Sequence, residues 1–262
     1  MVESVQTGLT HAAFVAQESD LRESPNGVRF AEFGDTNLVP ADLERMVQAV
    51  PSTIASLLLK RAFYFVPLAL AERSGDLPKG VSEPGDTLIA AAFSTEWSDQ
   101  AVCHRDVRLG DKEGIFISTR LLADRFALAF EFFINVGHAF VDVAGVPEHF
   151  SELVWAQALA DVRGETSHDA WENRAAALAA RKTEGKMQID EKAKNSYLEA
   201  AFSDAIAIYQ LSLAVDFDYA ELREREYPLL APQPLAERLR LVARLFPPNN
   251  GYEFAIRYRR RN

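Results

Sequence analysis

The sequence predicts an α+β fold built around a small β-sheet, on three observations. Helical patterns come first, at 41-ADLERMVQAV-50 and 52-STIASLLLK-60. Runs that favour β-strands follow between residues 62 and 119, and helical patterns alone fill the chain after Leu121. Because helices and strands are segregated along the chain, the order favours α+β over a doubly wound parallel sheet.

The first half of the chain has recognisable start and stop signals. Pro40 precedes the first expected helix and Pro51 precedes the second, as helix start signals. Gly110 and Asp111 predict a hairpin turn between the last two strands. The expected strands are 62-AFYFVPLAL-70, 88-LIAAAFS-94, 101-AVCHRDVRL-109 and 114-GIFIST-119, and residues 71–86 are expected to form a loop.

The second half is expected to be helical. A long helix over residues 121–144 should end at Gly145, with Pro147 as a stop signal. Further helices are expected at residues 149–162 and 195–215, and a helix, turn and helix over residues 219–246. The charged stretch 164–194 is either an exposed helix with a turn at Gly185 or an insertion. We expect residues 1–40 to be an N-terminal extension, residues 41–246 a single domain and residues 247–262 a tail.

Composition excludes several classes of function. The net charge of −10 and the pI of about 5.1 argue against a nucleic-acid binder, and the basic end 257-RYRRRN-262 is best read as a solvated tail. Cys103 is the only cysteine, so the chain has no internal disulfide and no cysteine-based zinc knuckle. There is no secretory signal pattern, and polar residues interrupt the apolar runs short of a membrane span. We therefore expect a cytoplasmic protein.

The long helix carries a stripe of polar side chains. In 131-EFFINVGHAFVDVAG-145, Glu131, Asn135, His138 and Asp142 recur at i, i+4, i+7 and i+11. This spacing places all four on one face of a helix that is otherwise apolar. Such a stripe indicates either a functional site or a hydrogen-bonded network, and a lone histidine on a core helix is more often part of a network.

The run 134-INVGHAFVD-142 resembles the zincin metallopeptidase motif H-E-x-G-H-A-x-x-D in its second half. Gly137, His138, Ala139 and Asp142 match that pattern. The segment 50-VPSTIASLLLKRAFYFVPLA-69 resembles the opening helix and strand of the anthrax lethal-factor type of zincin domain. The strand 110-GDKEGIFIST-119 and the helix 197-YLEAAFSDAIAIY-209 resemble later parts of the same domain. The resemblance implies a zincin-like fold over about residues 40–245.

The resemblance also implies that zinc ligands and the general base of the zincin site are missing. Ile134 stands where the first zinc histidine would be, and Asn135 stands where the catalytic glutamate would be. Isoleucine has no lone pair for zinc, and a neutral amide cannot act as the general base. On the later helix the third zinc ligand falls on Ala200, with Glu199 one residue away and Asp204 at the second glutamate of that motif.

Three hypotheses remain. The first is a zincin-like protein without zinc-peptidase activity, which binds a peptide or protein partner and needs no cofactor. The second is a hydrolase with an unusual metal site, in which His138 and Asp142 hold zinc or another divalent ion with Glu199 or Asp204. The third is a plain interaction domain with a polar network in its core.

Weaker motifs carry no further function. Cys103 and His104 would point to opposite faces of a strand, and 167-SHD-169 is best read as a helix N-cap at Ser167. No phosphate-binding glycine motif is present, so nucleotide binding has no support in the sequence.

Overall fold

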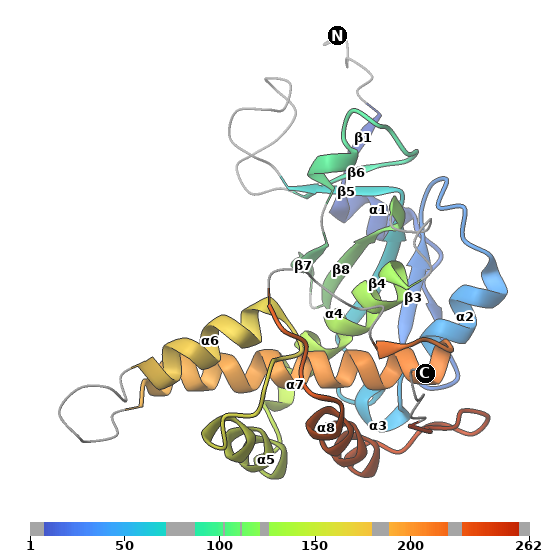
Figure 1. The fold of residues 1–262 in the computed structure, drawn as a ribbon. Helices are drawn as coiled ribbons and strands as arrows, with labels where there is room; N and C mark the ends of the chain where they lie inside the picture. Colours follow the sequence, from blue (N-terminus) through green and yellow to red (C-terminus); the bar gives the residue numbers. More distant parts are fainter. Residues whose placement is uncertain are drawn as a thin grey trace, which may run out of the picture. The chain divides into compact units, whose positions relative to one another are not determined.

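The structure is a computed structural model, and it is mixed α+β (Figure 1). It describes residues 8–71, 87–101, 103–110, 112–120, 126–179, 189–219 and 227–256. The chain divides into two compact units. Unit 1 contains residues 1–48 and 58–132, and unit 2 contains residues 49–57 and 133–262. The long helix α4 (Ala127–Ala144) begins in unit 1 and ends in unit 2.

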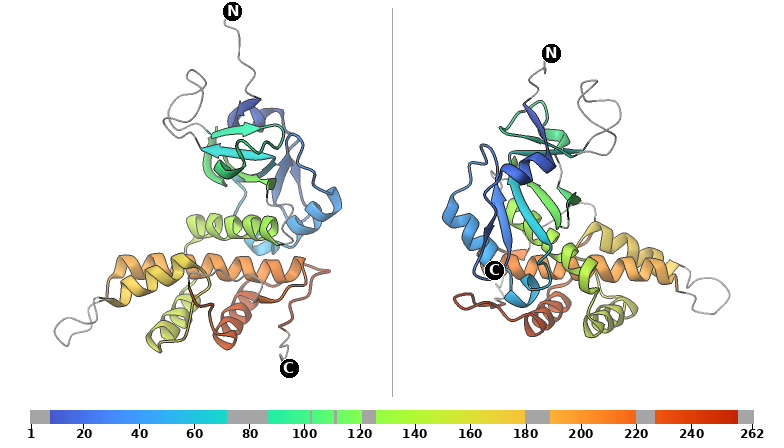
Figure 2. Two further views of the ribbon diagram at one scale, coloured as in Figure 1. Left: turned by 45° about the horizontal axis from the view of Figure 1, so that its top comes forward. Right: turned by 180° about the vertical axis from the view of Figure 1, so that it is seen from behind.

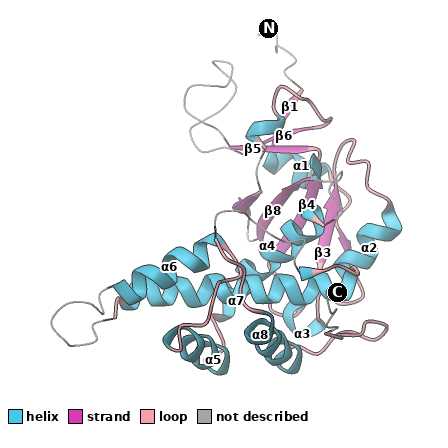
Figure 3. Cartoon of the chain, in the orientation of Figure 1, coloured by secondary structure: helices cyan, strands magenta, loops and turns pink. Residues whose placement is uncertain are grey.

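Unit 1 holds the strands, which form two sheets (Figure 3). The larger sheet has five strands in the order β2-β3-β4-β8-β7, and the smaller has three in the order β1-β6-β5. The strands are β1 (Leu9–His11), β2 (Arg22–Glu23), β3 (Arg29–Glu32), β4 (Arg61–Val66), β5 (Leu68–Ala71), β6 (Thr87–Ala90), β7 (His104–Leu109) and β8 (Lys112–Ser118). Besides the first part of α4, the helices among the described residues of unit 1 are α1 (Ala12–Glu18), α2 (Pro40–Gln48) and the 3₁₀ turn η1 (Ser98–Gln100).

The expected strand over residues 62–70 is two strands in two different sheets. β4 ends at Val66 and β5 begins at Leu68. Pro67 stands between them, and it has no N–H to donate to a ladder, so the pairing is interrupted there. The amide of Ala69 then bonds to the hydroxyl of Ser118 at 2.8 Å, which links β5 to the end of β8.

The centre of the large sheet is parallel. β4 pairs in parallel with both β3 and β8, and all six of its residues are buried. Strands buried on both faces lack polar alternation, which explains the run AFYFV in β4. Its aromatic rings pack closely: Tyr64 stacks on Phe116 with centroids 4.7 Å apart, and Phe63 meets Phe132 edge-on at 5.1 Å.

The first 40 residues differ from the separate extension that we expected. They supply β3, which lies inside the five-stranded sheet, and its Phe30 and Ala31 are buried. Arg22 also pairs with Glu32 at 2.9 Å across β2 and β3. The sequence signal is weak because β3 has only four residues, short of a clear period.

Unit 2 is helical among its described residues. Besides the second part of α4, its helices are α3 (Ser52–Ala55), α5 (Glu148–Leu159), α6 (His168–Ala179), α7 (Glu191–Ala214) and α8 (Pro232–Leu245). α6 and α7 lie side by side in each view of Figure 2. The aromatic core joins four segments through contacts among Phe140, Phe150, Phe202 and Phe246.

The helix α7 starts four residues before the expected start at residue 195. Asp190 is its N-cap, and its carboxylate accepts bonds from the amides of Lys192 and Ala193, each at 3.0 Å. Capping of two otherwise unpaired amides moves the helix start back to Glu191. The cap of α6 is the one expected, because the Ser167 hydroxyl accepts from the amide of Ala170 at 3.1 Å.

Several expected features lie outside the described residues. They are nearly all of the loop 71–86, Asp111 of the hairpin turn, residues 121–125 of the long helix, the turn at Gly185, residues 220–226 of the helix expected after residue 219, and the basic end 257–262. The neighbouring hairpin residues are described: Leu109 pairs with Lys112, and Gly110 has a φ of 70°. That left-handed conformation suits glycine in a tight hairpin turn.

Among the described residues, α4 alone is long and apolar enough to span a membrane by length and composition. The core helix of a soluble protein meets the same criterion, and 44% of α4 is buried within the protein. The sequence led us to expect that polar residues would exclude such a helix. Four polar residues do interrupt the helix, but its other residues are apolar enough to offset them over its full length.

Candidate functional site

The polar stripe of α4 runs from the interior to the surface. Asn135 is buried with 4% of its surface exposed, Glu131 and His138 are half-buried, and Asp142 is exposed. None of the four is without an interaction partner. The stripe is therefore a set of partnered side chains, and its last member lies in solvent.

Within unit 2, α4 and α7 approach closely at one point. A Cβ atom on Gly137 would lie 2.8 Å from the carbonyl oxygen of Ser203 and 3.0 Å from its Cα. Real Cβ atoms do not approach a backbone so closely, so glycine is needed here. The contact joins the two segments that carry the resemblance to zincins, the G-H-A-x-x-D run and the helix 197–209.

The positions of the missing zinc ligands lie near this contact along each helix. Ile134 is one turn before Gly137, and Ala200 is one turn before Ser203. Both residues are half-buried, as is His138. At these positions the chain offers only His138 as a zinc ligand, and this donor set does not fit a site that needs three protein ligands.

The two acidic candidates on α7 have separate environments. Glu199 is exposed, and Asp204 is buried with 5% exposed. The hydroxyl of Thr166 donates to Oδ2 of Asp204 at 2.7 Å, and the Ser167 hydroxyl is a second hydrogen-bond partner. Asp204 is therefore held by the loop that precedes α6.

Burial raises the pKa of the Asp204 carboxyl from 3.8 to about 6. The hydrogen bonds from Ser167 and Thr166 and the positive charge of Arg238 lower this pKa in part, because they favour the ionised form. A carboxyl with such a pKa changes charge near neutral pH. Perturbed carboxyls are frequent at functional sites, but structural networks perturb pKa values as well.

A buried ionic cluster lies beside Asp204, and it was not predicted. We call it the Glu165 cluster, and its members are Gln157, Glu165, Arg174, Tyr197 and Arg238. They come from α5, α6, α7, α8 and the loop before α6. Each is at most 6% exposed, so the cluster is a part of the core of unit 2.

Glu165 is the centre of the cluster, and its side chain is fully buried. Its Oε2 accepts from Nη1 of Arg238 at 2.9 Å, and its Oε1 accepts from the Tyr197 hydroxyl at 2.7 Å and from Arg174 at 3.2 Å. Nε of Arg238 donates to the Gln157 side chain at 2.8 Å. A buried carboxylate is tolerable only when it is paired and hydrogen-bonded in this way.

The backbone around Glu165 is fixed by a second segment of the chain. Its amide donates to the carbonyl of Pro228 at 3.0 Å, and the amide of Leu230 donates back to its carbonyl at 2.9 Å. At Gly164, with a φ of +81°, a Cβ would overlap with the Leu229 carbonyl oxygen. Glycine is thus needed for these segments to meet.

The pKa values of Tyr197 and Arg238 in the cluster are both raised. Desolvation raises the pKa of the Tyr197 hydroxyl well above its usual range. Desolvation alone would lower the pKa of Arg238, but the charges and hydrogen bonds of Tyr197 and Glu165 more than offset it. Tyr197 therefore stays neutral and Arg238 stays charged, which suits a structural pairing and provides no general acid or base at neutral pH.

The expected metal candidates do not gather into one place. Among the described residues, no group of three or more His, Cys, Asp or Glu side chains is positioned to hold a metal ion. Cys103 is a half-buried thiol outside any disulfide, and the side chain of His104 lies outside the description. Compared with known proteins, this chain matches no protein-family model and no curated protein.

Two sequence signals could have revealed the Glu165 cluster. Arg174 lies on the buried stripe of α6 with Ala170 and Ala177, at i, i+4 and i+7. Arg238 lies likewise between the buried Leu235 and Val242 of α8. A charged residue on an apolar helix stripe indicates a buried ion pair, whereas the charge of the 164–194 stretch as a whole suggested a solvated face.

Proposed function

We propose that this chain is a zincin-like protein that binds a peptide or protein segment and has lost zinc-dependent hydrolysis. The main observation that supports this proposal is the contact of Gly137 with the backbone of Ser203. It brings together the two helices whose motifs resemble zincins, while Ile134 and Asn135 replace the first ligand and the base.

The loss of hydrolysis follows from the residues themselves. A zinc peptidase needs three protein ligands and a group that takes a proton from the attacking water. His138 is one ligand, and Asn135 cannot take the proton. Asn135 is also buried, which suits a structural amide better than a group that meets a substrate.

An extended peptide suits an edge in unit 1. β7 is an outer strand of the five-stranded sheet and is antiparallel to β8. An outer strand has unpaired backbone groups that can bind an extended segment by β-strand addition. A binding function of this kind needs no cofactor, and it is consistent with a cytoplasmic protein.

The metal-dependent alternative has less support from the residues that it would use. Asp142 and Glu199 are exposed, and Asp204 already accepts hydrogen bonds from Thr166 and Ser167. His138 would therefore need exposed partners to hold an ion, and such sites bind divalent ions weakly.

The test is the metal content of the purified protein by mass spectrometry, with zinc titrations of the wild type and His138→Ala. We expect no stoichiometric metal, no difference between the two proteins, and no cleavage in peptidase and esterase screens. Near-stoichiometric zinc that disappears in His138→Ala would reject the proposal in favour of the metal-dependent hydrolase.

A further inference from the structure

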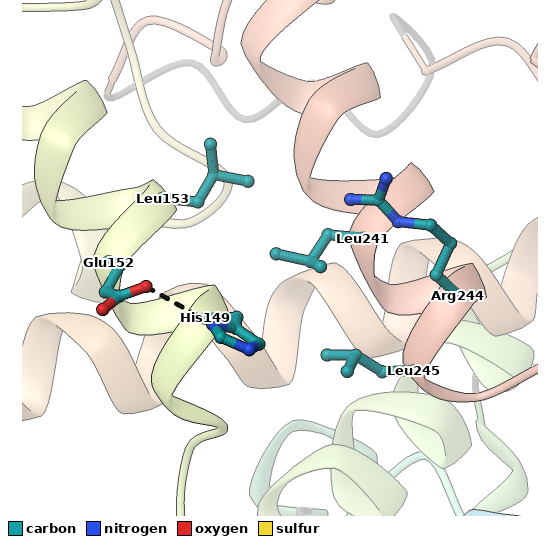
Figure 4. A pocket seen from close by; sticks show the side chains of 6 residues that line it. All are labelled: His149, Glu152, Leu153, Leu241, Arg244 and Leu245. Atoms are coloured by element: carbon teal, nitrogen blue, oxygen red, sulfur yellow. Dashed lines mark hydrogen bonds and ion pairs between the residues drawn. The ribbon is translucent and has the colours of Figure 1, made fainter.

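A surface groove lies between α5 and α8, both in unit 2 (Figure 4). Its volume is about 700 Å³, and its lining includes Leu153 from α5 and Leu241 and Leu245 from α8. In Figure 4 the two leucines of α8 point toward α5 across the groove. The groove therefore presents an apolar floor on the surface of the unit.

The two walls of the groove differ in charge. On α5, Nδ1 of His149 lies 3.4 Å from Oε2 of Glu152, so this carboxylate already has a partner. On α8, Arg244 is exposed and has no hydrogen-bond or ion-pair partner among the residues that the structure describes. The cation of the groove thus lies on the α8 wall and its carboxylate on the α5 wall, on a chain whose net charge is −10.

The exposed arginines of α8 have the same spacing as the leucines that line the groove. Arg240 is exposed one turn before Arg244 and likewise has no partner in the described part of the chain. Leu241 and Leu245 are also one turn apart. Residues at i and i+4 on a helix are neighbours along its axis, so α8 presents an apolar row beside a cationic row.

We propose that this groove binds an acidic amphipathic helix of a partner protein. A helix that runs along α8 repeats its side chains with the same spacing. Its apolar residues contact Leu153, Leu241 and Leu245, and its carboxylates pair with Arg240 and Arg244. This is the helix-in-groove mode of recognition, in which apolar residues at i, i+3, i+4 and i+7 occupy a cleft between helices.

This groove does not depend on the resemblance to zincins. It uses neither the α4 motif nor β7. A failure of peptide binding at the groove would therefore not bear on the zinc test at His138, and zinc binding at His138 would not bear on the groove. The arginines supply selectivity for acidic partners, and the leucines supply apolar contact.

The test uses two fluorescent 18-residue helix-forming peptides with one leucine stripe in common. One peptide has Glu on both flanks of the stripe, and the other has Lys. We expect the full chain to bind the Glu peptide about fivefold more tightly, because two exposed ion pairs contribute. Fluorescence anisotropy measures both affinities, and the preference should decrease as salt is raised.

Charge-reversal variants distinguish charge-specific recognition of the peptide from non-specific apolar binding. The variant Arg240→Glu/Arg244→Glu should prefer the Lys peptide, and Leu245→Gln should weaken binding of both peptides. The matched control is Lys192→Glu, an exposed cation at the start of α7, which should leave the preference unchanged. Equal affinities for both peptides, an unaltered preference in the double variant, or no binding at about 1 mM peptide would overturn the proposal.

Discussion

The polar stripe of α4 and the Glu165 cluster are two polar regions that differ in how well the sequence predicts them. The stripe is evident from spacing alone, because one helix carries Glu131, Asn135, His138 and Asp142. Yet it ends in solvent at Asp142. The cluster comes from five separate segments and is fully buried around Glu165. Polar spacing on one helix thus predicts alignment, whereas burial depends on which other segments pack against it.

The largest effect should come from Arg238 in the cluster. Arg238→Met leaves the buried carboxylate of Glu165 without its closest cationic partner, and it also removes a donor to Gln157. Breaking a buried ion pair from one side costs roughly 3–5 kcal/mol of the free energy of unfolding. Urea denaturation of the full chain measures it.

Arg240→Met is the matched control, because Arg240 is exposed on the same helix. It should change the free energy of unfolding by no more than about 0.5 kcal/mol. If the two variants were equally stable, the Glu165 cluster would not be the buried ionic core that we describe.

A smaller effect should follow from Gly137→Ala on α4. The added methyl would meet the backbone of Ser203 at 2.8 Å, and backbone cannot move aside as a flexible side chain can. Overpacking of this kind costs about 1–3 kcal/mol, against about 1 kcal/mol gained from the better helix propensity of alanine.

Thermal unfolding compares Gly137→Ala with Val143→Ala, since Val143 is exposed on the same helix. A net loss of stability in Gly137→Ala alone supports the close approach of α4 and α7. A more stable Gly137→Ala variant would contradict it.

Asp204 should make stability depend on pH. Its pKa is raised from 3.8 to about 6, so between these values the folded protein binds more protons than the unfolded chain. The contribution of this group is fully present below pH 3.8 and is lost as pH rises through about 6. Relative to Asp204→Asn, the wild type should lose about 2 kcal/mol of stability between pH 4 and 7.

Urea denaturation at several pH values, for the wild type and Asp204→Asn, gives this difference directly. Asparagine keeps an oxygen that accepts from Thr166, so the variant retains that contact. Parallel pH profiles for the two proteins would mean that Asp204 has an ordinary pKa.

The smallest effect should come from Asp142 at the exposed end of the stripe. Asp142→Ala should change the free energy of unfolding by less than about 0.5 kcal/mol, as for other surface substitutions. A cost of several kcal/mol would show that Asp142 belongs to a buried network, and would make the two regions alike.

The mixed α+β class and the helices after residue 126 were predictable because they follow from local periodicity, whereas the strands β1–β3 that precede α2 were not expected. The α+β class, the hairpin of β7 and β8 and the cap at Ser167 were all evident from a few neighbouring residues. The split of residues 62–70 between two sheets was less evident, although Pro67 is its physical cause. The role of β3 in the larger sheet depends on pairing with β4, which lies about thirty residues later in the chain.

The motif of the candidate site on α4 was predictable, but the contacts between the helices around it were not. Asn135 and His138 were found from spacing and from the resemblance to zincins. The partners of Asp204 were not, because Thr166 precedes it by 38 residues in a stretch whose overall charge suggested exposure. Contacts between segments distant in sequence leave no local period, so sequence patterns cannot reveal them.

The most direct test of the zincin-like account is to restore the site. The variant Ile134→His/Asn135→Glu/Ala200→Glu places ligands and a base at the three positions where the resemblance lacks them. Its control, Val143→His/Ala144→Glu/Ala200→Glu, keeps the change on α7 and moves the other two to exposed residues of α4. Zinc titration by calorimetry should show near-stoichiometric binding by the restored variant alone. If the restored variant folds with unchanged circular dichroism and still binds no zinc, the chain does not have a zincin-like site.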